Sequence, residues 1–268
     1  MMKPHSNPPA GQPDRSEQRR GQRAGRGPST AAGDGAGNVM VLLTIASVVL
    51  STIVAVAWLT PLFHAAAVFP FFYTAMRQRR TGASLALVVR WGAAVLLATI
   101  VLGVFVPARM EASQLLSART VPVLESWLTS AQAPPPADYS YILWGMAVLL
   151  VGSVVSGGLV GFVVGSLALG GAATGALFLY EHGRNIVQIT LTALPPWQLC
   201  LLACGALLLV PAATPFFDRF IKSEVPGESR KPLRIYMYAG AVCFVLSVLL
   251  RLTAAGAWQR LLQRWTVF

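Results

Sequence analysis

An uncharged run at residues 141–180 is the feature that most constrains this chain. One helix needs roughly 20 mostly apolar residues to cross the hydrocarbon core of a bilayer, so this run of about 40 is long enough for two crossings. Small residues recur in it at every fourth position: Ser153, Gly157, Gly161 and Gly165. That spacing puts them on one face of a continuous helix, and small faces let helix backbones approach closely in lipid. We therefore predict that this run is the tightly packed centre of a polytopic membrane protein.

Composition leads to the same class of protein. Hydrophobic residues make up 55% of the chain and charged residues 12%, whereas a soluble domain carries about 25% charged residues. The formal net charge of +11 comes from clusters between apolar runs, as expected of anchors at a membrane surface. A specific patch for anionic lipid or nucleic acid is the alternative. We predict that the lipid bilayer is the main partner and that the protein does not bind nucleic acid. Partner subunits in the membrane or the cytoplasm stay open.

The first segment, residues 1–38, is rich in Pro, Gly, Ser, Arg and Gln. It has too few large apolar side chains to offset the entropy lost on ordering, so we expect a disordered tail. Its arginines place it in the cytoplasm by the positive-inside rule.

The rest of the chain, residues 39–257, is predicted to be an all-α bundle with about six or seven transmembrane segments. The expected spans are 39–59, 84–106, two within 140–180, 198–210 and 235–250. Two further apolar stretches, 62–76 and 186–194, are short for a crossing and either cross fully or stay in the interface.

Three polar segments flank these spans. The nearly neutral stretch 107–138 suits an external loop with an amphipathic interfacial helix. The basic stretch 218–234 and the cluster Arg77, Arg79 and Arg80 suit the cytoplasm. Residues 258–268 are expected to form a short amphipathic tail.

The central run needs a break, and the sequence offers two positions for it. A break at Ser156-Gly157-Gly158 gives spans near 140–156 and 159–180. A break at Gly170-Gly171 gives one long tilted span followed by a shorter helix.

Four ionisable residues in or beside the spans are candidates for a polar site. Arg90 lies inside the span predicted at 84–106, where a charge must snorkel to the surface or pair within the bundle. His64 lies between two prolines, and Glu181-His182 follows the central run. His64 and the Glu181-His182 pair each have two interpretations. They form a site for acid–base chemistry or proton transfer, or they are polar residues at the end of a helix.

Motifs for enzyme chemistry are missing from the sequence. It contains neither a His-Glu-x-x-His pair nor a Gly-x-x-x-x-Gly-Lys phosphate loop. Cys200 and Cys204 share a helix face, which suits either a soft metal or ordinary packing, and no third ligand lies close in sequence. We predict no catalytic residue, no metal and no cofactor, and lean against an enzyme.

Several short motifs resemble an uncharacterised family of bacterial multi-span inner-membrane proteins. The motifs are Phe71-Phe72-Tyr73, Arg77-Gln78-Arg79-Arg80-Thr81-Gly82, Val106-Pro107-Ala108-Arg109-Met110, Trp127-Leu128-Thr129 and Leu194-Pro195-Pro196-Trp197. Pro135-Pro136-Ala137 departs from the Pro-Gln-His of that family. A more distant likeness is to stage II sporulation protein M-like proteins. The resemblance implies a multi-pass protein of the bacterial inner membrane and supplies no known reaction.

Two functions therefore stay open. Proline-broken helices beside a glycine-rich centre are typical of a transport or permease-type component. A non-enzymatic scaffold or assembly subunit of a membrane complex is the alternative.

Overall fold

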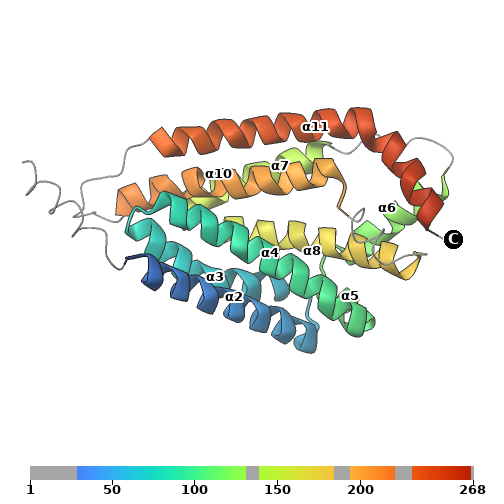
Figure 1. Cartoon of the computed structure of the whole chain (residues 1–268), viewed down its shortest axis with the longest axis horizontal. Coiled ribbons are helices and arrows are strands. Elements are labelled where there is room, and N and C mark those ends of the chain that lie inside the picture. Colours follow the sequence, from blue (N-terminus) through green and yellow to red (C-terminus); the bar gives the residue numbers. More distant parts are fainter. Residues whose placement is uncertain (1–28, 131–138, 184–193, 221–230, 267–268) are drawn as a thin grey trace, which may run out of the picture. The chain divides into compact units, whose positions relative to one another are not determined.

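The structure is a computed structural model that describes residues 29–130, 139–183, 194–220 and 231–266. Within these residues the chain forms nine helices and no strand (Figure 1). They are α2 (Ser29–Val54), α3 (Thr60–Arg77), α4 (Thr81–Phe105), α5 (Pro107–Ser113), α6 (Ser117–Thr129), α7 (Tyr139–Ser156), α8 (Leu159–Glu181), α10 (Pro196–Phe220) and α11 (Lys231–Trp265). The predicted all-α polytopic bundle is confirmed.

Five of these helices are long and apolar enough to cross a membrane: α2 from Gly35, α4, α8, α10 and α11 from Leu233. Helix α7 adds a shorter apolar stretch, Ile142–Ser156. Helix α3 covers the predicted short segment 62–76. Whether α3 and α7 also cross decides between five spans and the predicted six or seven.

The chain divides into two units, Met1–Asn38 and Val39–Phe268. Only 29–38 of the first unit is described, and these residues form the first turns of α2. Helix α2 thus begins before the predicted start of the first span at Val39. The rest of the predicted disordered tail lies outside the described residues.

Helix α8 is the centre of the second unit, because it packs against α3, α4, α6, α7 and α10. Its glycines receive the side chains of these neighbours. The indole of Trp91 from α4 comes within 3.4 Å of the position a Cβ would take on Gly165, and Leu124 from α6 comes within 3.3 Å at Gly175. Close approach of backbones at small residues is how helices pack in lipid, where the hydrophobic effect no longer drives them together.

The turn between α7 and α8 decides between the two predicted breaks. Gly157 and Gly158 have φ of +64° and +101°, backbone conformations that side chains with a Cβ rarely adopt. The run therefore breaks at Ser156-Gly157-Gly158.

The predicted single helix face is consequently wrong. Ser153 belongs to α7, Gly157 to the turn, and Gly161 and Gly165 to α8. Two of the four still meet, because the Ser153 hydroxyl and Leu209 of α10 lie against the position that a Cβ would take on Gly161.

The end of the first span is also corrected. Helix α2 ends at Val54, and Ala55 follows with φ of +52°. The predicted end was Leu59, with Thr60-Pro61 as the terminator. Pro61 instead lies in the first turn of α3, where a missing N–H leaves no hydrogen bond unmade.

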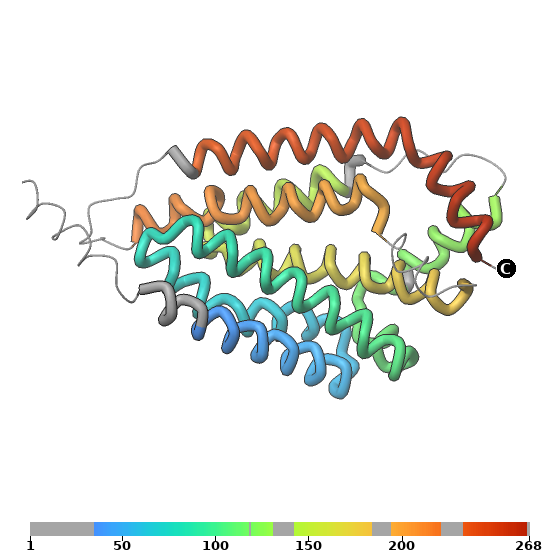
Figure 2. The backbone as a smooth tube through the Cα atoms, viewed as in Figure 1, coloured from blue at the N-terminus to red at the C-terminus, as the bar shows by residue number. Residues whose placement is uncertain are grey.

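The C-terminal segment is continuous with the last span. Helix α11 runs from Lys231 to Trp265, so residues 258–265 are its final turns and not a separate tail. Figure 2 shows these turns bending away from the long straight part of the helix. There the amides of Gln259 and Gln263 donate hydrogen bonds to carbonyl oxygens at the end of α6, including that of Leu128 at 2.8 Å.

The predicted external segment 107–138 contains two helices in its described part. The short helix α5 buries Met110 and Ser113, and α6 buries Leu128. The predicted interfacial stretch 186–194 lies outside the described residues except for Leu194, as does 221–230 of the predicted cytoplasmic loop.

Candidate functional site

A buried histidine joins four helices in the middle of the bundle. His64, in the second turn of α3, is 1% exposed. Its Nδ1 lies 2.8 Å from the Ser166 hydroxyl of α8, and its Nε2 lies 3.4 Å from the Ser51 hydroxyl of α2. The indole N–H of Trp91 in α4 donates a hydrogen bond to the His64 carbonyl oxygen at 3.0 Å. We call Ser51, His64 and Ser166 the His64 cluster.

Three aromatic rings pack together on the helices that carry this cluster: Trp91 binds the His64 carbonyl oxygen, and Phe162 precedes Ser166 by one turn of α8. Phe162 packs edge-on against both Phe72 and Trp91, with ring centroids 5.0 Å apart in each pair. Phe72 and Phe162 are fully buried. These rings leave the polar atoms of the cluster in an apolar shell, where each hydrogen bond is electrostatically stronger than in water.

Two buried hydroxyls lie in the same helices without hydrogen-bond partners in the described residues. Thr60 lies four residues before His64, on the same face of α3, and is 3% exposed. Thr99, on the buried face of α4, is 1% exposed. Buried polar groups are nearly always paired, so unpaired hydroxyls often mark a place where a bound group or water belongs.

A second polar group fills the gap between α5 and α8. The Ser113 hydroxyl and the Gln114 amide each lie 3.5 Å from the sulfur of Met110. The side-chain oxygen Oε1 of Gln114 lies against Gly170 of α8, in the place that a Cβ would occupy. Gly170 is one turn from Ser166, so this group approaches the His64 cluster along a single face of α8.

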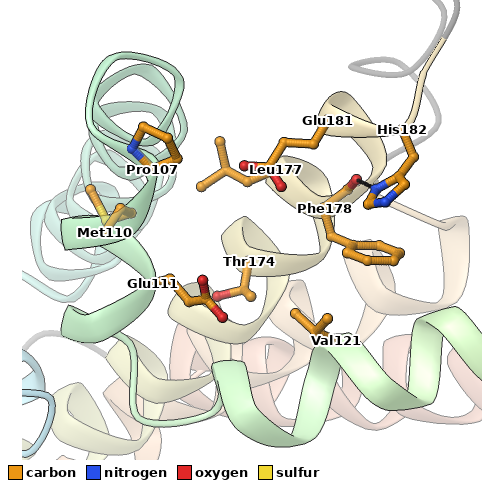
Figure 3. Close-up of a pocket in the computed structure, with 9 residues that line it drawn as sticks. All are labelled: Pro107, Met110, Glu111, Val121, Thr174, Leu177, Phe178, Glu181 and His182. Atoms are coloured by element: carbon orange, nitrogen blue, oxygen red, sulfur yellow. Dashed lines mark hydrogen bonds between the residues drawn. The ribbon is translucent and has the colours of Figure 1, made fainter.

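A cavity of about 250 Å³ opens where α5, α6 and the end of α8 meet (Figure 3). Glu111 of α5 and Glu181 of α8 reach it from opposite sides. His182 lines its edge, and its Nδ1 lies 2.9 Å from the Phe178 carbonyl oxygen. Two carboxylates give this cavity a negative potential in a chain that is basic overall.

The four predicted polar residues occupy three separate places. His64 is buried in the core, whereas Arg90 is exposed on α4. Glu181 and His182 lie together at the cavity. Ser166 precedes Glu181 by 15 residues on α8, which corresponds to about 22 Å of helix, so the structure does not bring His64 together with the Glu181-His182 pair.

No metal centre is assembled in the described residues. They contain no group of three or more His, Cys, Asp or Glu side chains that could hold an ion. Cys204 is buried, Cys200 and Cys243 are half-buried, and all three are free thiols.

Sequence reasoning missed the partners of His64. Ser51, Ser166 and Thr60 are ordinary small residues in apolar runs, and nothing in their spacing points to a histidine on another helix. A helical-face analysis of α8 would have aligned Ser166 with Gly170 and Thr174, but it would not have named the neighbour.

Comparison with known proteins adds no assignment: no protein-family model, curated protein or solved structure matches this chain. The resemblance to a bacterial membrane family therefore stays a prediction based on its short motifs.

Proposed function

We propose that this multi-pass membrane protein is a transport-type component that moves or couples to protons, with the His64 cluster as its central site. The observation that carries the proposal is a fully buried, ionisable ring held between hydroxyls of two other helices. Ionisable residues within a membrane are expensive to keep and usually mark a pathway for ions or protons.

The depth of the cluster supports this role. Trp91, which binds the His64 carbonyl, lies near the middle of the 25-residue helix α4. Transporter sites lie near the bilayer midplane, often beside interrupted helices. Pro70 lies inside α3 beyond His64, and Pro211 and Pro215 lie inside α10; both helices are continuous, so the predicted proline breaks are only missing backbone N–H groups within them.

The geometry suits a proton relay. A neutral imidazole has one N–H donor and one acceptor nitrogen, and a serine hydroxyl can both donate and accept. Ser51 passes its hydroxyl proton to Nε2 as its oxygen accepts the incoming proton, which makes an imidazolium and leaves Ser51 neutral. The imidazolium then releases the Nδ1 proton to the Ser166 oxygen as Ser166 passes its own hydroxyl proton onward. The ring is left with its proton on the other nitrogen, and a ring turn restores the first state. The 3.4 Å separation between Nε2 and Ser51 is the longer step and must shorten for transfer.

Proton flux into liposomes tests the proposal. The full chain is reconstituted with a pH-sensitive dye inside, and a potassium gradient with valinomycin drives proton entry. We expect wild-type flux above that of protein-free liposomes. His64→Gln keeps an amide for hydrogen bonding but cannot carry a proton, so its flux should fall to the protein-free level.

His182→Gln is the matched control, because it removes a histidine that lies outside the core. It should keep wild-type flux, and both variants should elute as monodisperse protein. Wild-type flux equal to that of empty liposomes, or full flux in His64→Gln, would contradict the proposal.

The second candidate, a scaffold subunit, is favoured by the aromatic packing beside the cluster. The packed rings of Phe72, Trp91 and Phe162, of which Trp91 binds the His64 carbonyl oxygen, also suit a rigid structural clamp. In that case His64→Gln lowers the melting temperature while no variant changes proton flux. The two functions thus predict different results for the same pair of measurements.

We also propose an orientation in the bacterial inner membrane, with the start of α2 on the cytoplasmic side. Arg79 and Asp218, from two segments predicted to be cytoplasmic, form an ion pair at 3.5 Å. The final turns of α11 contact α6, in the segment predicted to be external. If α3 and α7 cross as well, the seven spans put these two groups of residues on opposite sides.

Cysteine labelling tests this orientation in a background in which Cys200, Cys204 and Cys243 are changed to alanine. Ala112→Cys in α5 should react with a membrane-impermeant maleimide added outside spheroplasts. Arg219→Cys at the end of α10 should react only after permeabilisation. Both residues are exposed, and labelling of both from one side would overturn the scheme.

A further inference from the structure

Arg90 is a charge in the middle of an exposed helix face. It lies on α4 among exposed apolar residues that include Val89, Leu97 and Val101. Within the described parts of the chain the structure gives it no ion pair or hydrogen bond, whereas Arg79 pairs with Asp218. An arginine that faces lipid at this depth is costly unless an anion reaches it.

Its depth exceeds what snorkelling alone can cover. When the 25-residue helix α4 is centred on a hydrocarbon core of about 30 Å, Arg90 lies three residues before the helix centre and about 10 Å below the surface of that core. An extended arginine side chain recovers roughly one helical turn, about 5 Å, of that depth. The guanidinium therefore does not reach the headgroups, so an anion must enter the outer part of the hydrocarbon core to neutralise it.

The surface above Arg90 leaves a path for such a counter-ion. Side chains on a helix tilt toward its N-terminus, so Arg90 leans toward the end of α4 that begins at Thr81. Ala86 and Ala83 precede it on the same face and are exposed. A Cβ built on Gly82 would meet nothing within 4 Å. These small, exposed residues form a strip that runs from the start of α4 to Arg90, and we call this strip the furrow.

We propose that Arg90 binds the phosphate of an anionic phospholipid whose headgroup is drawn into this furrow. Arg77 and Arg80 are exposed at the same end of the bundle and add positive charge at the mouth of the furrow. Basic clusters beside a span attract anionic lipids, and a guanidinium forms paired hydrogen bonds with phosphate. This site is separate from the proposed proton relay, because Arg90 is exposed whereas His64 is buried.

Native mass spectrometry of the full chain in detergent tests the site. Phosphatidylglycerol, phosphatidylcholine and inorganic phosphate are titrated against wild type, Arg90→Gln and Arg264→Gln. Arg264 is an exposed arginine at the far end of α11, so its variant loses the same charge elsewhere. We expect Arg90→Gln to hold phosphatidylglycerol about tenfold more weakly than wild type, because it loses a charged hydrogen bond.

The remaining arms identify the source of the phosphate. Arg264→Gln should bind phosphatidylglycerol as wild type does. Phosphatidylcholine and inorganic phosphate should bind more weakly than phosphatidylglycerol in wild type and in Arg264→Gln, and this preference should shrink in Arg90→Gln. Equal retention of phosphatidylglycerol by wild type and Arg90→Gln overturns the proposal.

Crosslinking in native membranes gives an independent test. A photoreactive residue placed at Ala86 lines the furrow and leaves Arg90 intact. Crosslinks to phospholipid support the proposal. Crosslinks mainly to another membrane protein would show that an acidic side chain of a partner neutralises Arg90, and would overturn the lipid assignment.

Discussion

Helices α8 and α11 each contain an 18-residue stretch of almost equal hydropathy and are both long enough to cross a bilayer, but 61% of that stretch is buried in α8 and 11% in α11. Helix α8 receives neighbours at successive glycines, which are Gly161, Gly165, Gly170, Gly171 and Gly175. Helix α11 instead presents large exposed side chains along its length, which include Tyr238, Val242, Val245, Leu249 and Leu252.

The difference shows that apolarity and side-chain size carry separate information. Apolarity decides that a helix enters the membrane, since lipid and protein interiors are both apolar. Size decides what the helix faces, because glycine lets a neighbouring backbone approach and a large aliphatic side chain suits lipid. Four predictions, in order of decreasing effect, test this comparison.

The largest effect is expected from Gly161→Leu in α8. Its new side chain would collide with Leu209 and Ser153, so we expect a loss of about 1–3 kcal/mol, the usual range for overpacking. The matched change in α11 is Gly256→Leu, whose Cβ would meet only Arg260, at 4.0 Å. Thermal aggregation temperatures in detergent measure both, and equal temperatures would falsify the packed role of α8.

The turn that begins α8 gives the second effect. Gly158→Ala forces a Cβ into a backbone with φ of +101° and toward the ring of Phe72, so we expect a loss of roughly 1–2 kcal/mol from the backbone alone. Gly145→Ala, in open space within α7, should leave stability unchanged or slightly raised. A melting curve for Gly158→Ala that overlays wild type would show that the turn adapts freely.

A smaller difference separates the serines of the two helices. Ser166→Ala in α8 removes a partner of the buried His64 ring, whereas Ser247→Ala in α11 removes a hydrogen bond of 2.7 Å to the Trp197 carbonyl oxygen. Hydrogen bonds between membrane helices contribute about 0.6 kcal/mol on average and up to about 1.7. We expect Ser166→Ala to lie near the upper value and Ser247→Ala near the average, as measured by chemical unfolding in mixed micelles. The reverse order would mean that the His64 cluster adds little stability.

The smallest effect is expected on the lipid side of α11. Leu249 is 53% exposed, so Leu249→Ala should change stability by less than about 0.5 kcal/mol. Leu169→Ala in α8 is its counterpart, because Leu169 is 7% exposed and its removal opens a cavity that lipid cannot refill. If both changes in stability are equally large in the same unfolding assay, a partner protein covers α11.

Sequence reasoning succeeded where one strong physical effect acts alone. Long apolar runs must be helices in lipid, because only helices satisfy their own backbone hydrogen bonds there. The class of fold and the helix at 84–106 followed from this, and α4 matches that span within a few residues. Sequence reasoning predicted helix boundaries less well, because two effects compete there. Pro61 can end one helix or begin the next, and only the packing of α3 on α4 and α8 selects the second.

The candidate site was less predictable, because it depends on contacts between helices distant in sequence. His64 was a candidate as one of three histidines, but its hydroxyl partners lie 13 and 102 residues away. Two positions were predicted for the Arg90 side chain: it would extend to the membrane surface, or it would pair with a charge inside the bundle. The structure places it on an exposed face, where pairing inside the described bundle is not available.

The glycine turn between α7 and α8 has a consequence for biosynthesis. Only Gly157 and Gly158 join these two helices, and no charged residue occurs between 141 and 180. The connection therefore offers no polar loop to retain in the cytoplasm and no arginine to orient the pair by the positive-inside rule. We expect α7 and α8 to leave the translocon together as a preformed hairpin, with their direction set by the spans made before them. Helix α8, the most buried of the five candidate spans in the described residues, would then be oriented by the neighbouring spans and not by charges of its own.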